Sequence, residues 1–379
     1  MTHEENLPWE LTEEILSRVP PISLVRFRAV SKQWDALFDD KTFINNHKST
    51  FRFILTTKSK IYSVSIDPKI VVRELTLGIQ GLEYQVLKAI VECGEFLLCG
   101  MDNRSAVWNP WLNRTRWFKD EVGQPKLILE GIGYDSNIRA EGKMYNTIWY
   151  RPRESSMLKH TEWTIHDCAS DAWKDVMAED EGRKLPTFST SSVLLNGNLY
   201  WVVHVEGTDL ASYFLNKFDF SKERFFRFCD LPCGMNHPRN ALVLRVFKGD
   251  RFSLLTQCYV TKKIEVWVTK NKINDEEDGG DVVWISLMSF PILDLPSLVL
   301  KRYSQPSYFI DDKRLVVCSC DETGWAWIYV MGENKLISKT RIDSVVDKWP
   351  KHCTYFPSLV PIPRGQRAKR KSEESEEEA

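Results

Sequence analysis

Three pairs of soft metal ligands stand close together in the sequence. They are His166 with Cys168, Cys229 with Cys233, and Cys318 with Cys320. Each pair could supply two of the four ligands that a structural zinc site needs, but no matching second pair accompanies any of them. We therefore interpret the nine cysteines as reduced and mainly buried thiols, and we expect neither a metal nor another cofactor.

Sequence motifs for catalysis are missing as well. The chain has no Gly-x-Ser-x-Gly elbow, no glycine-rich phosphate loop with its lysine, and no His-Glu-x-x-His zinc helix. Carboxylate clusters such as Asp275–Asp278 stand beside Gly279 and Gly280, a pattern that is typical of a solvated loop. We expect no catalytic residues, and we predict that the chain is not an enzyme.

The overall charge excludes partners that are recruited by a global electrostatic field. Lys and Arg number 51 and Asp and Glu number 52, so neither nucleic acid nor an acidic membrane is an expected partner. No apolar stretch approaches the roughly 20 residues of a transmembrane helix. The polar residues 1–6 do not resemble a signal peptide. We expect an intracellular protein, in the nucleus, the cytoplasm or both.

From residue 51 to about 361 the apolar pattern alternates, which predicts an all-β region. A hairpin recurs, with two strands joined by a short turn that carries Asn, Asp or Ser. The copies are 61–66 with 71–77, 106–110 with 115–118, 163–167 with 172–176, 216–220 with 224–228, 264–268 with 282–285, and 325–330 with 336–338. Another strand pair flanks the Asn196-Gly197 turn, which indicates about four strands per repeat.

Repeats at this spacing are typical of kelch-type propeller blades. The glycine pairs of a regular kelch array are missing, so we predict an irregular propeller, with a twisted double-sheet arrangement as the alternative. Strand alternation places most tryptophans of this region in the core between blades rather than on a recognition surface. These tryptophans are Trp108, Trp111, Trp117, Trp173, Trp201, Trp267, Trp284 and Trp325.

The first fifty residues have helical periodicity instead. Apolar residues at 11–19 recur at helical spacing after Pro8, and Pro20 ends that helix. A second short apolar segment spans 24–27, and Ser31 can cap a third helix. Three short helices without a disulfide or metal have little core of their own, so we expect this unit to need a partner.

The helical unit also has more apolar residues than its interior can hold. An internal core could be formed by Leu11, Ile15, Val19, Phe27 and Trp34. The residues that remain cannot all be hidden within it: Leu7, Pro8, Ile22, Leu24, Val25 and Val30. Contiguous apolar surface of this kind predicts a docking face for another protein.

Residues 7–20, Leu-Pro-Trp-Glu-Leu-Thr-Glu-Glu-Ile-Leu-Ser-Arg-Val-Pro, and 23–34, Ser-Leu-Val-Arg-Phe-Arg-Ala-Val-Ser-Lys-Gln-Trp, resemble the F-box. That family binds Skp1, which links it to a cullin, while the rest of the protein holds a substrate for ubiquitination. The resemblance implies that the Skp1-facing or supporting apolar surface comes from Leu7, Pro8, Ile15, Leu16, Val19, Pro20, Leu24 and Val25. Family members often have lysine where Ile22 stands and cysteine where Ser31 stands, and neither departure removes an apolar anchor.

The β-region resembles the plant F-box-associated interaction domain. The motifs are Val-Trp-Asn-Pro-Trp-Leu-Asn-Arg-Thr-Arg-Trp at 107–117, Gly-Tyr-Asp at 133–135, Leu-Asn-Gly-Asn-Leu-Tyr-Trp at 195–201 and Phe-Pro-Ser-Leu-Val at 356–360. The expected fold is α+β and multidomain. It comprises a three-helix F-box at 1–50, an all-β domain at 51–362 that is an irregular kelch-like β-propeller, and a disordered charged tail at 363–379.

The leading hypothesis is a substrate adaptor of an SCF (Skp1-cullin-F-box) ubiquitin ligase, which binds a Skp1-like protein directly, a cullin indirectly and an unknown protein substrate. Alternatives are a scaffold that holds Skp1 without a cullin, and a propeller enzyme with carboxylates converging on its axis. Candidate loops for substrate contact are 135–143, 151–159, 206–213, 272–280 and 294–305. In the tail, Arg367, Lys369, Arg370 and Lys371 are either a nuclear import signal or part of a merely solvated segment.

Overall fold

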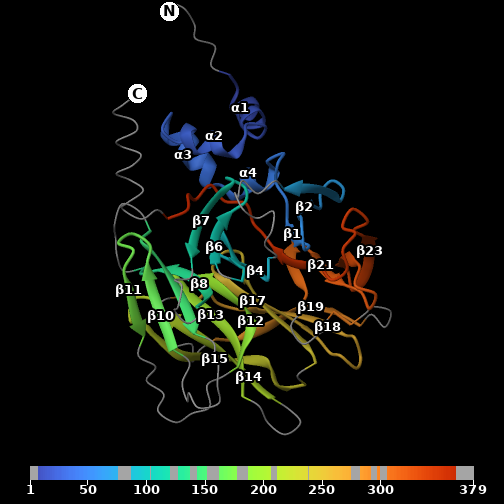
Figure 1. Cartoon of the computed structure of the whole chain (residues 1–379). Helices are drawn as coiled ribbons and strands as arrows, with labels where there is room; N and C mark the ends of the chain where they lie inside the picture. The colour runs from blue at the N-terminus through green and yellow to red at the C-terminus, as the bar shows by residue number, and fades with distance from the viewer. Residues whose placement is uncertain are drawn as a thin grey trace, which may run out of the picture.

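The computed structural model places four short helices above a propeller of six four-stranded sheets (Figure 1). The structure describes residues 7–75, 87–102, 104–119, 127–136, 143–151, 162–176, 187–205, 211–237, 239–274, 282–291, 297–298 and 305–363. Within these ranges no helix is both long and apolar enough to cross a membrane.

The four helices follow the predicted boundaries and add one element. They are α1 (Trp9–Leu16), α2 (Pro21–Phe27), α3 (Lys32–Asp39) and α4 (Lys41–Asn46). As predicted, Ser31 caps the third helix, because its Oγ accepts a hydrogen bond from the amide of Trp34 at 3.2 Å. The prediction of three helices is wrong. The Asp40 carboxylate accepts a bond from the amide of Thr42 at 2.6 Å, and this cap begins α4, which buries Phe43.

Each blade is an antiparallel sheet of four strands. Five blades use four consecutive strands. One comprises β4 (Ala89–Cys93), β5 (Phe96–Gly100), β6 (Arg104–Asn109) and β7 (Arg114–Lys119), and the next comprises β8 (Ile128–Tyr134), β9 (Tyr145–Arg151), β10 (Glu162–Asp167) and β11 (Trp173–Val176). They are followed by the blade of β12 (Thr187–Leu195), β13 (Asn198–Val205), β14 (Ala211–Asp219) and β15 (Arg224–Asn236), by that of β16 (Ala241–Phe247), β17 (Arg251–Gln257), β18 (Ile264–Thr269) and β19 (Trp284–Phe290), and by that of β20 (Ser307–Asp311), β21 (Arg314–Cys320), β22 (Ala326–Gly332) and β23 (Lys335–Arg341). The sixth blade combines β1 (Phe53–Thr56), β2 (Ile61–Ser65) and β3 (Val71–Leu75) with β24 (Lys351–Thr354).

The predicted hairpins are confirmed. They are the antiparallel pairs β2–β3, β6–β7, β10–β11, β14–β15, β18–β19 and β22–β23. The first pairing is described as far as Leu75, and the predicted continuation at 76–77 lies outside the described residues. The Asn196-Gly197 turn joins β12 to β13 as expected, with both residues at positive φ. The propeller, not the double-sheet alternative, is therefore the fold.

The ring is closed by pairing the end of the chain with its beginning. β24 lies antiparallel to β1, with Phe53 opposite Thr354 and Thr56 opposite Lys351. Around the centre, contacts between inner strands join β24 to β4, β8 to β12, β12 to β16, β16 to β20 and β20 to β24, whereas β8 contacts β5. The inner strand β12 also contacts β4, two blades away. This extra contact makes the propeller irregular, as the missing kelch glycines predicted.

Most of the tryptophans considered above lie in the core. Trp108, Trp111 and Trp201 are buried, and Trp117, Trp267, Trp284 and Trp325 are partly buried. The prediction is wrong for Trp173, which is 50% exposed because β11 is the outer edge strand of its blade. Two further tryptophans are buried as well: Trp163, which begins the predicted hairpin 163–167, and Trp149, which the repeat pattern did not single out.

A histidine in the closing strand makes the fold sensitive to acid. The Nδ1 atom of His352 on β24 lies 2.8 Å from the Oγ atom of Ser307 on β20. Burial lowers the pKa of His352 to about 4, and the nearby positive charge of Arg245 acts in the same direction. Since an unfolded histidine has a pKa of about 6.5, the folded chain binds fewer protons than the unfolded chain between these values. Stability is therefore lost as the pH falls below about 6.5.

The substitution His352→Gln removes this proton site while it keeps a polar side chain. We expect the free energy of unfolding to fall less between about pH 7 and pH 5 than in the wild type, by about 1–2 kcal/mol. Urea unfolding of both proteins at the two pH values measures the difference. Parallel pH profiles for the two proteins would contradict the assignment.

Candidate docking site on the N-terminal helices

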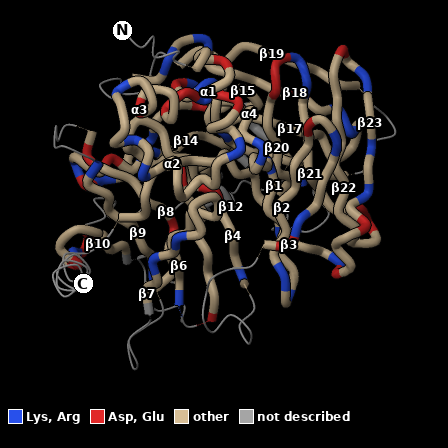
Figure 2. Tube along the Cα trace, turned by 90° about the horizontal axis from the view of Figure 1, so that it is seen from above, with Lys and Arg blue, Asp and Glu red and all other residues tan. Residues whose placement is uncertain are grey.

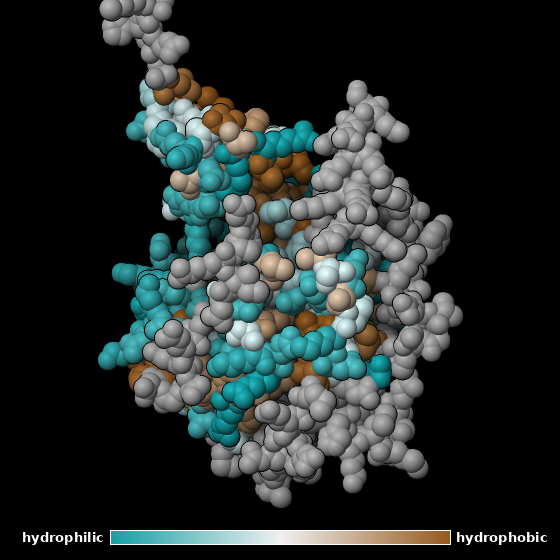
Figure 3. Space-filling view, turned by 90° about the vertical axis from the view of Figure 1, so that its left-hand side faces the viewer, coloured by the Kyte–Doolittle hydropathy of each residue, from teal (hydrophilic) through white to brown (hydrophobic). Residues whose placement is uncertain are grey.

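One side of α1 presents apolar side chains to solvent. Leu7, Leu11 and Ile15 are spaced four residues apart and are 52%, 52% and 55% exposed. We name these three residues the docking face. The opposite side of α1 carries Leu16, which is 2% exposed and belongs to the core. The space-filling view shows hydrophobic residues gathered on the helical part at the top of the molecule (Figure 3).

A partly buried arginine holds the helices in their mutual arrangement. Arg28, directly after α2, places its Nη1 2.7 Å from Asp35 and its Nη2 2.7 Å from Asp39, both on α3. Nη2 also donates to the carbonyl of Phe38 at 3.3 Å. Partial burial disfavours the charge, but the two carboxylates raise the pKa of Arg28 above its usual value. The guanidinium therefore links α2 to α3 without using the docking face.

The helices share one hydrophobic core with the propeller. This core joins helix residues such as Leu24 and Phe38 to Trp108, Trp111 and Tyr355 of the β-region. Leu24 and Phe38 are both 0% exposed. A helical unit of this size cannot bury enough surface by itself, and here the propeller supplies the missing partner.

Polar contacts fix the same junction. His47 Nε2 lies 2.9 Å from the carbonyl oxygen of Val19, and its ring packs edge-on against Trp111, with the ring centroids 5.1 Å apart. Trp111 Nε1 donates to Ser49 Oγ at 3.0 Å. The amide of Lys48 donates to the carbonyl of Ser17 at 3.0 Å. The segment after α4 is thus tied both back to α1 and forward to the β6–β7 turn.

Asn109 connects this turn to the end of the chain. Its Oδ1 accepts hydrogen bonds from the amides of Trp111 and Leu112, each at 3.1 Å, and from the Tyr355 hydroxyl at 2.9 Å. Its Nδ2 donates to the carbonyls of Ser358 at 2.9 Å and Val360 at 3.0 Å. The Asn-Pro element was interpreted as a turn signal, but its fully buried side chain also joins two distant segments.

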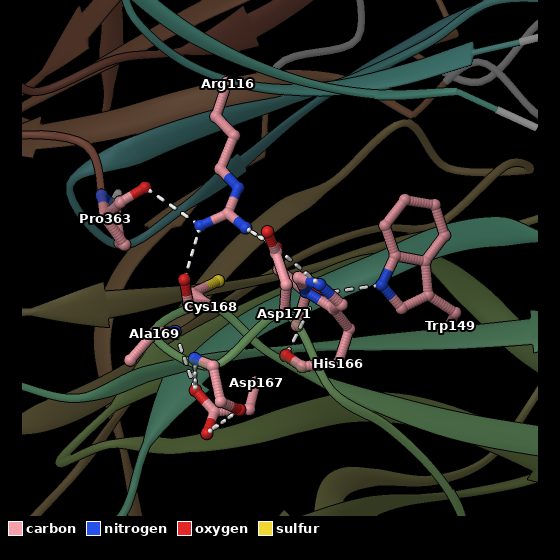
Figure 4. Close-up of polar contacts among 10 residues, drawn as sticks. Arg116, Trp149, His166, Asp167, Cys168, Ala169, Asp171 and Pro363 are labelled. Carbon is pink, nitrogen blue, oxygen red and sulfur yellow. Dashed lines mark hydrogen bonds and ion pairs between the residues drawn. The ribbon is translucent and has the colours of Figure 1, made fainter. Parts of the chain in front are cut away.

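The predicted soft-ligand pair on β10 takes part in a contact between blades (Figure 4). Arg116 on β7 donates to the carbonyls of Cys168 at 2.7 Å and Pro363 at 3.2 Å, and it pairs with the carboxylate of Asp171. His166 Nε2 lies 3.2 Å from the same Asp171 oxygen. Burial lowers the pKa of His166, and Arg116 lowers it further. The lowered pKa favours a neutral His166, which lies in the contact between the two blades that Figure 4 shows.

Three thiols of the predicted ligand pairs, Cys168, Cys229 and Cys318, are protonated at neutral pH. Burial raises the pKa of Cys168 to about 11 and that of Cys229 to about 12, and it raises the pKa of Cys318 well above its usual value. Across the described ranges, no three His, Cys, Asp or Glu residues are grouped as a metal site. A thiol must lose its proton to act as a nucleophile or metal ligand, so these positions serve packing.

The propeller-enzyme hypothesis requires carboxylates that converge on the axis. The inner strand β4 contributes Glu92, whose Oε2 lies 3.7 Å from Arg245 Nη1 on β16 and accepts a bond from the Thr354 hydroxyl on β24. Burial raises the pKa of Glu92, whereas Arg245 and Thr354 lower it. The described arrangement is a single carboxylate with a cation and a hydroxyl, not a pair of facing carboxylates.

Some predicted sites lie outside the described residues. This holds for most of the candidate substrate loops, which are 135–143, 151–159, 206–213, 272–280 and 294–305. It also holds for the whole predicted import segment, Arg367, Lys369, Arg370 and Lys371. The described ends of the first loop are near Tyr134 and Lys143, and both side chains line a cavity below the helices.

Two family models match the chain. The F-box domain matches residues 5–46, and the F-box associated beta propeller domain matches residues 52–362. The chain belongs to the F-box proteins. It is 56% identical to F-box protein At2g14710 of Arabidopsis thaliana, with 98% of this chain and 99% of that protein covered. From the same plant, F-box/kelch-repeat protein At3g16580 is 56% identical, with 97% and 98% covered. Protein SUPPRESSOR OF NIM1 1 is 44% identical, with 94% and 98% covered.

An F-box domain indicates binding to a Skp1-like protein, and its combination with this propeller supports the general role of a substrate adaptor of the SCF type. Of the predicted F-box anchors, Leu7, Pro8, Ile15 and Pro20 are exposed. Val19 and Val25 are partly buried. Leu16 and Leu24 are buried, so they support the surface from below and are not available to a partner.

Leu11 and Ile15, which could have formed an internal core, do not belong to one, because both are more than half exposed. Trp9 and Leu16, seven residues apart, lie on the side of α1 that packs against the core. That seven-residue spacing is the signal that could have placed Leu11 and Ile15 on the outer side. The F-box therefore presents an apolar surface that includes Leu11.

The docking face can be tested without disturbing the fold. We expect Ile15→Asp to weaken binding to a plant Skp1-like protein at least tenfold, because a charge would replace an apolar anchor, while the melting temperature stays unchanged. The matched control is Ile337→Asp on β23, since Ile337 is 52% exposed and lies on the propeller. Leu24→Asp should instead unfold the helices. Calorimetric titration measures the affinities, and a wild-type affinity for Ile15→Asp would contradict the assignment.

Proposed function

We propose that this F-box protein is the substrate receptor of an SCF ubiquitin ligase. In this role the docking face binds a Skp1-like protein, a cullin joins the complex through that protein, and the propeller holds a substrate for ubiquitination. The exposed Leu7, Leu11 and Ile15, above a helical unit fixed to the propeller, support the proposal most directly. The complex would act inside the cell, in the nucleus, the cytoplasm or both.

The shared core matters for this function because ubiquitin transfer depends on placing a substrate lysine near the enzyme that carries ubiquitin. A flexible linker would spread the substrate over many positions, whereas a fixed junction raises the effective concentration of the lysine. The contacts of His47 with Val19 and of Trp111 with Ser49 leave the described segment between α4 and β1 little freedom to hinge. The receptor thus contributes position, and other subunits carry out the chemistry.

The decisive experiment compares wild-type protein with Ile15→Asp after expression of a tagged full chain in plant cells. We expect a cullin and a Skp1-like protein to co-elute with the wild type, and both to be lost with Ile15→Asp. The Ile337→Asp variant serves as the control that retains both. Co-elution of the Skp1-like protein without a cullin would contradict the ligase and favour the scaffold role.

A further inference from the structure

A large cavity lies between the helices and the propeller. Its volume is about 1350 Å³, and it is lined by residues of α3 and α4 and by the inner strands β4, β12, β16 and β20. Small-molecule pockets usually measure about 300–1,000 Å³, so this cavity has room for a segment of polypeptide. Figure 3 shows hydrophobic surface in the hollow between the helical part and the blades.

At the inner end of the cavity lies Arg245 of β16, with a side chain that is 10% exposed. Its Nε is buried and has no hydrogen-bond partner, and the contact with Glu92 is an ion pair at 3.7 Å rather than a hydrogen bond. A guanidinium has five donors, and leaving them unused in a buried place is costly. The Nε–H of Arg245 is therefore a donor that no described group uses.

The groups around Arg245 are held by one another. Ser253 Oγ lies 2.9 Å from the Tyr308 hydroxyl, and both residues line the cavity. Glu92 is fixed by the hydroxyl of Thr354, so its position against Arg245 is set by β4 and β24 together. A carboxylate that entered the cavity would meet the Arg245 guanidinium already held in place beside Glu92.

Basic groups also surround the outer part of the cavity. Seven of the described lining side chains are basic and five are acidic. Ion pairs within the protein satisfy Asp39, Glu92, Glu95 and Asp311. Within the described residues, Lys41, Lys248 and Lys313 take part in none of the ion pairs, and the same holds for Asp312. The charge of Lys41 acts on Asp250. Seen from above, basic and acidic residues are interspersed along the strands and helices of the molecule (Figure 2).

We propose that this cavity binds an acidic peptide segment of the substrate, with one carboxylate of that segment held by Arg245. This inference rests on the proposed receptor function and specifies its substrate class. The guanidinium binds the carboxylate through two parallel N–H bonds, a geometry that arginine favours. Lys248 and Lys313 attract further acidic residues, and the apolar walls at Leu195 and Ile310 contact side chains between them.

The test uses full-length protein purified with its Skp1-like partner and an immobilised library of random twelve-residue peptides. The main variant is Arg245→Gln with Glu92→Gln, which removes the cation without leaving an unpaired buried carboxylate. A second variant, Lys248→Gln with Lys313→Gln, changes only the outer part. The matched control is Lys335→Gln on β23, which removes an exposed lysine outside the cavity. Melting curves establish that each variant is folded.

For the wild type and the control we expect the bound peptides to be enriched in Asp or Glu at one fixed position. The Arg245 variant should bind a selected peptide at least tenfold more weakly than the wild type. Replacing the acidic residue of that peptide by the corresponding amide should weaken its binding to the wild type by as much. The Lys248 variant should lose about two- to fivefold at moderate salt. An absent acidic preference, or a preference unchanged in the Arg245 variant, overturns the inference.

A free small anion could bind Arg245 in the same way as a peptide carboxylate. A second experiment distinguishes the two ligands. Citrate and inorganic phosphate are titrated against the same proteins. Tight Arg245-dependent binding of either anion, without peptide binding, also overturns the inference. Co-elution with the Skp1-like protein and a cullin reports on the proposed function independently. Retained co-elution together with lost acidic preference therefore rejects this inference alone.

Discussion

The arrangement of this F-box protein depends on a shortage of core in its first fifty residues. Four helices of eight residues or fewer cannot enclose their own apolar side chains. The structure meets this constraint by packing Leu24, Phe38 and Phe43 onto Trp111 and Tyr355 of the β-region. Only then can Leu7, Leu11 and Ile15 stay exposed without unfolding the helices, so the same contact provides both the fold and the docking face.

The closure of the propeller and the position of the helices are linked through the end of the chain. β24 closes the ring on β1, and the residues after it pass back towards the helices. There Tyr355 donates to Asn109, and the carbonyls of Ser358 and Val360 accept bonds from the same side chain. Loosening the closing strand would therefore also loosen the support of the helices. This coupling links the docking face to the cavity through one set of contacts.

Local patterns in the sequence predicted the elements well, and contacts between distant segments were not predictable. Alternating apolar residues and turn residues are features of short stretches of sequence, so the predictions of the six hairpins and of the Ser31 cap were correct. The outward direction of Leu11 depends on which side of α1 meets the propeller, and the exposure of Trp173 depends on β11 being an edge strand. Arg245 and Glu92 meet only because two inner strands, over a hundred residues apart, face the same axis.

The central claim is that helices and propeller form one body, and hydrogen–deuterium exchange of the full chain tests it most directly. Amides of α2 and α3 should be protected as strongly as those of β6. The substitution Trp111→Ala should raise exchange in the helices and in the β6–β7 blade together, because both lose the same core residue. Rapid exchange of the wild-type helices beside protected blades would contradict the account, since it would describe a module that moves independently of the propeller.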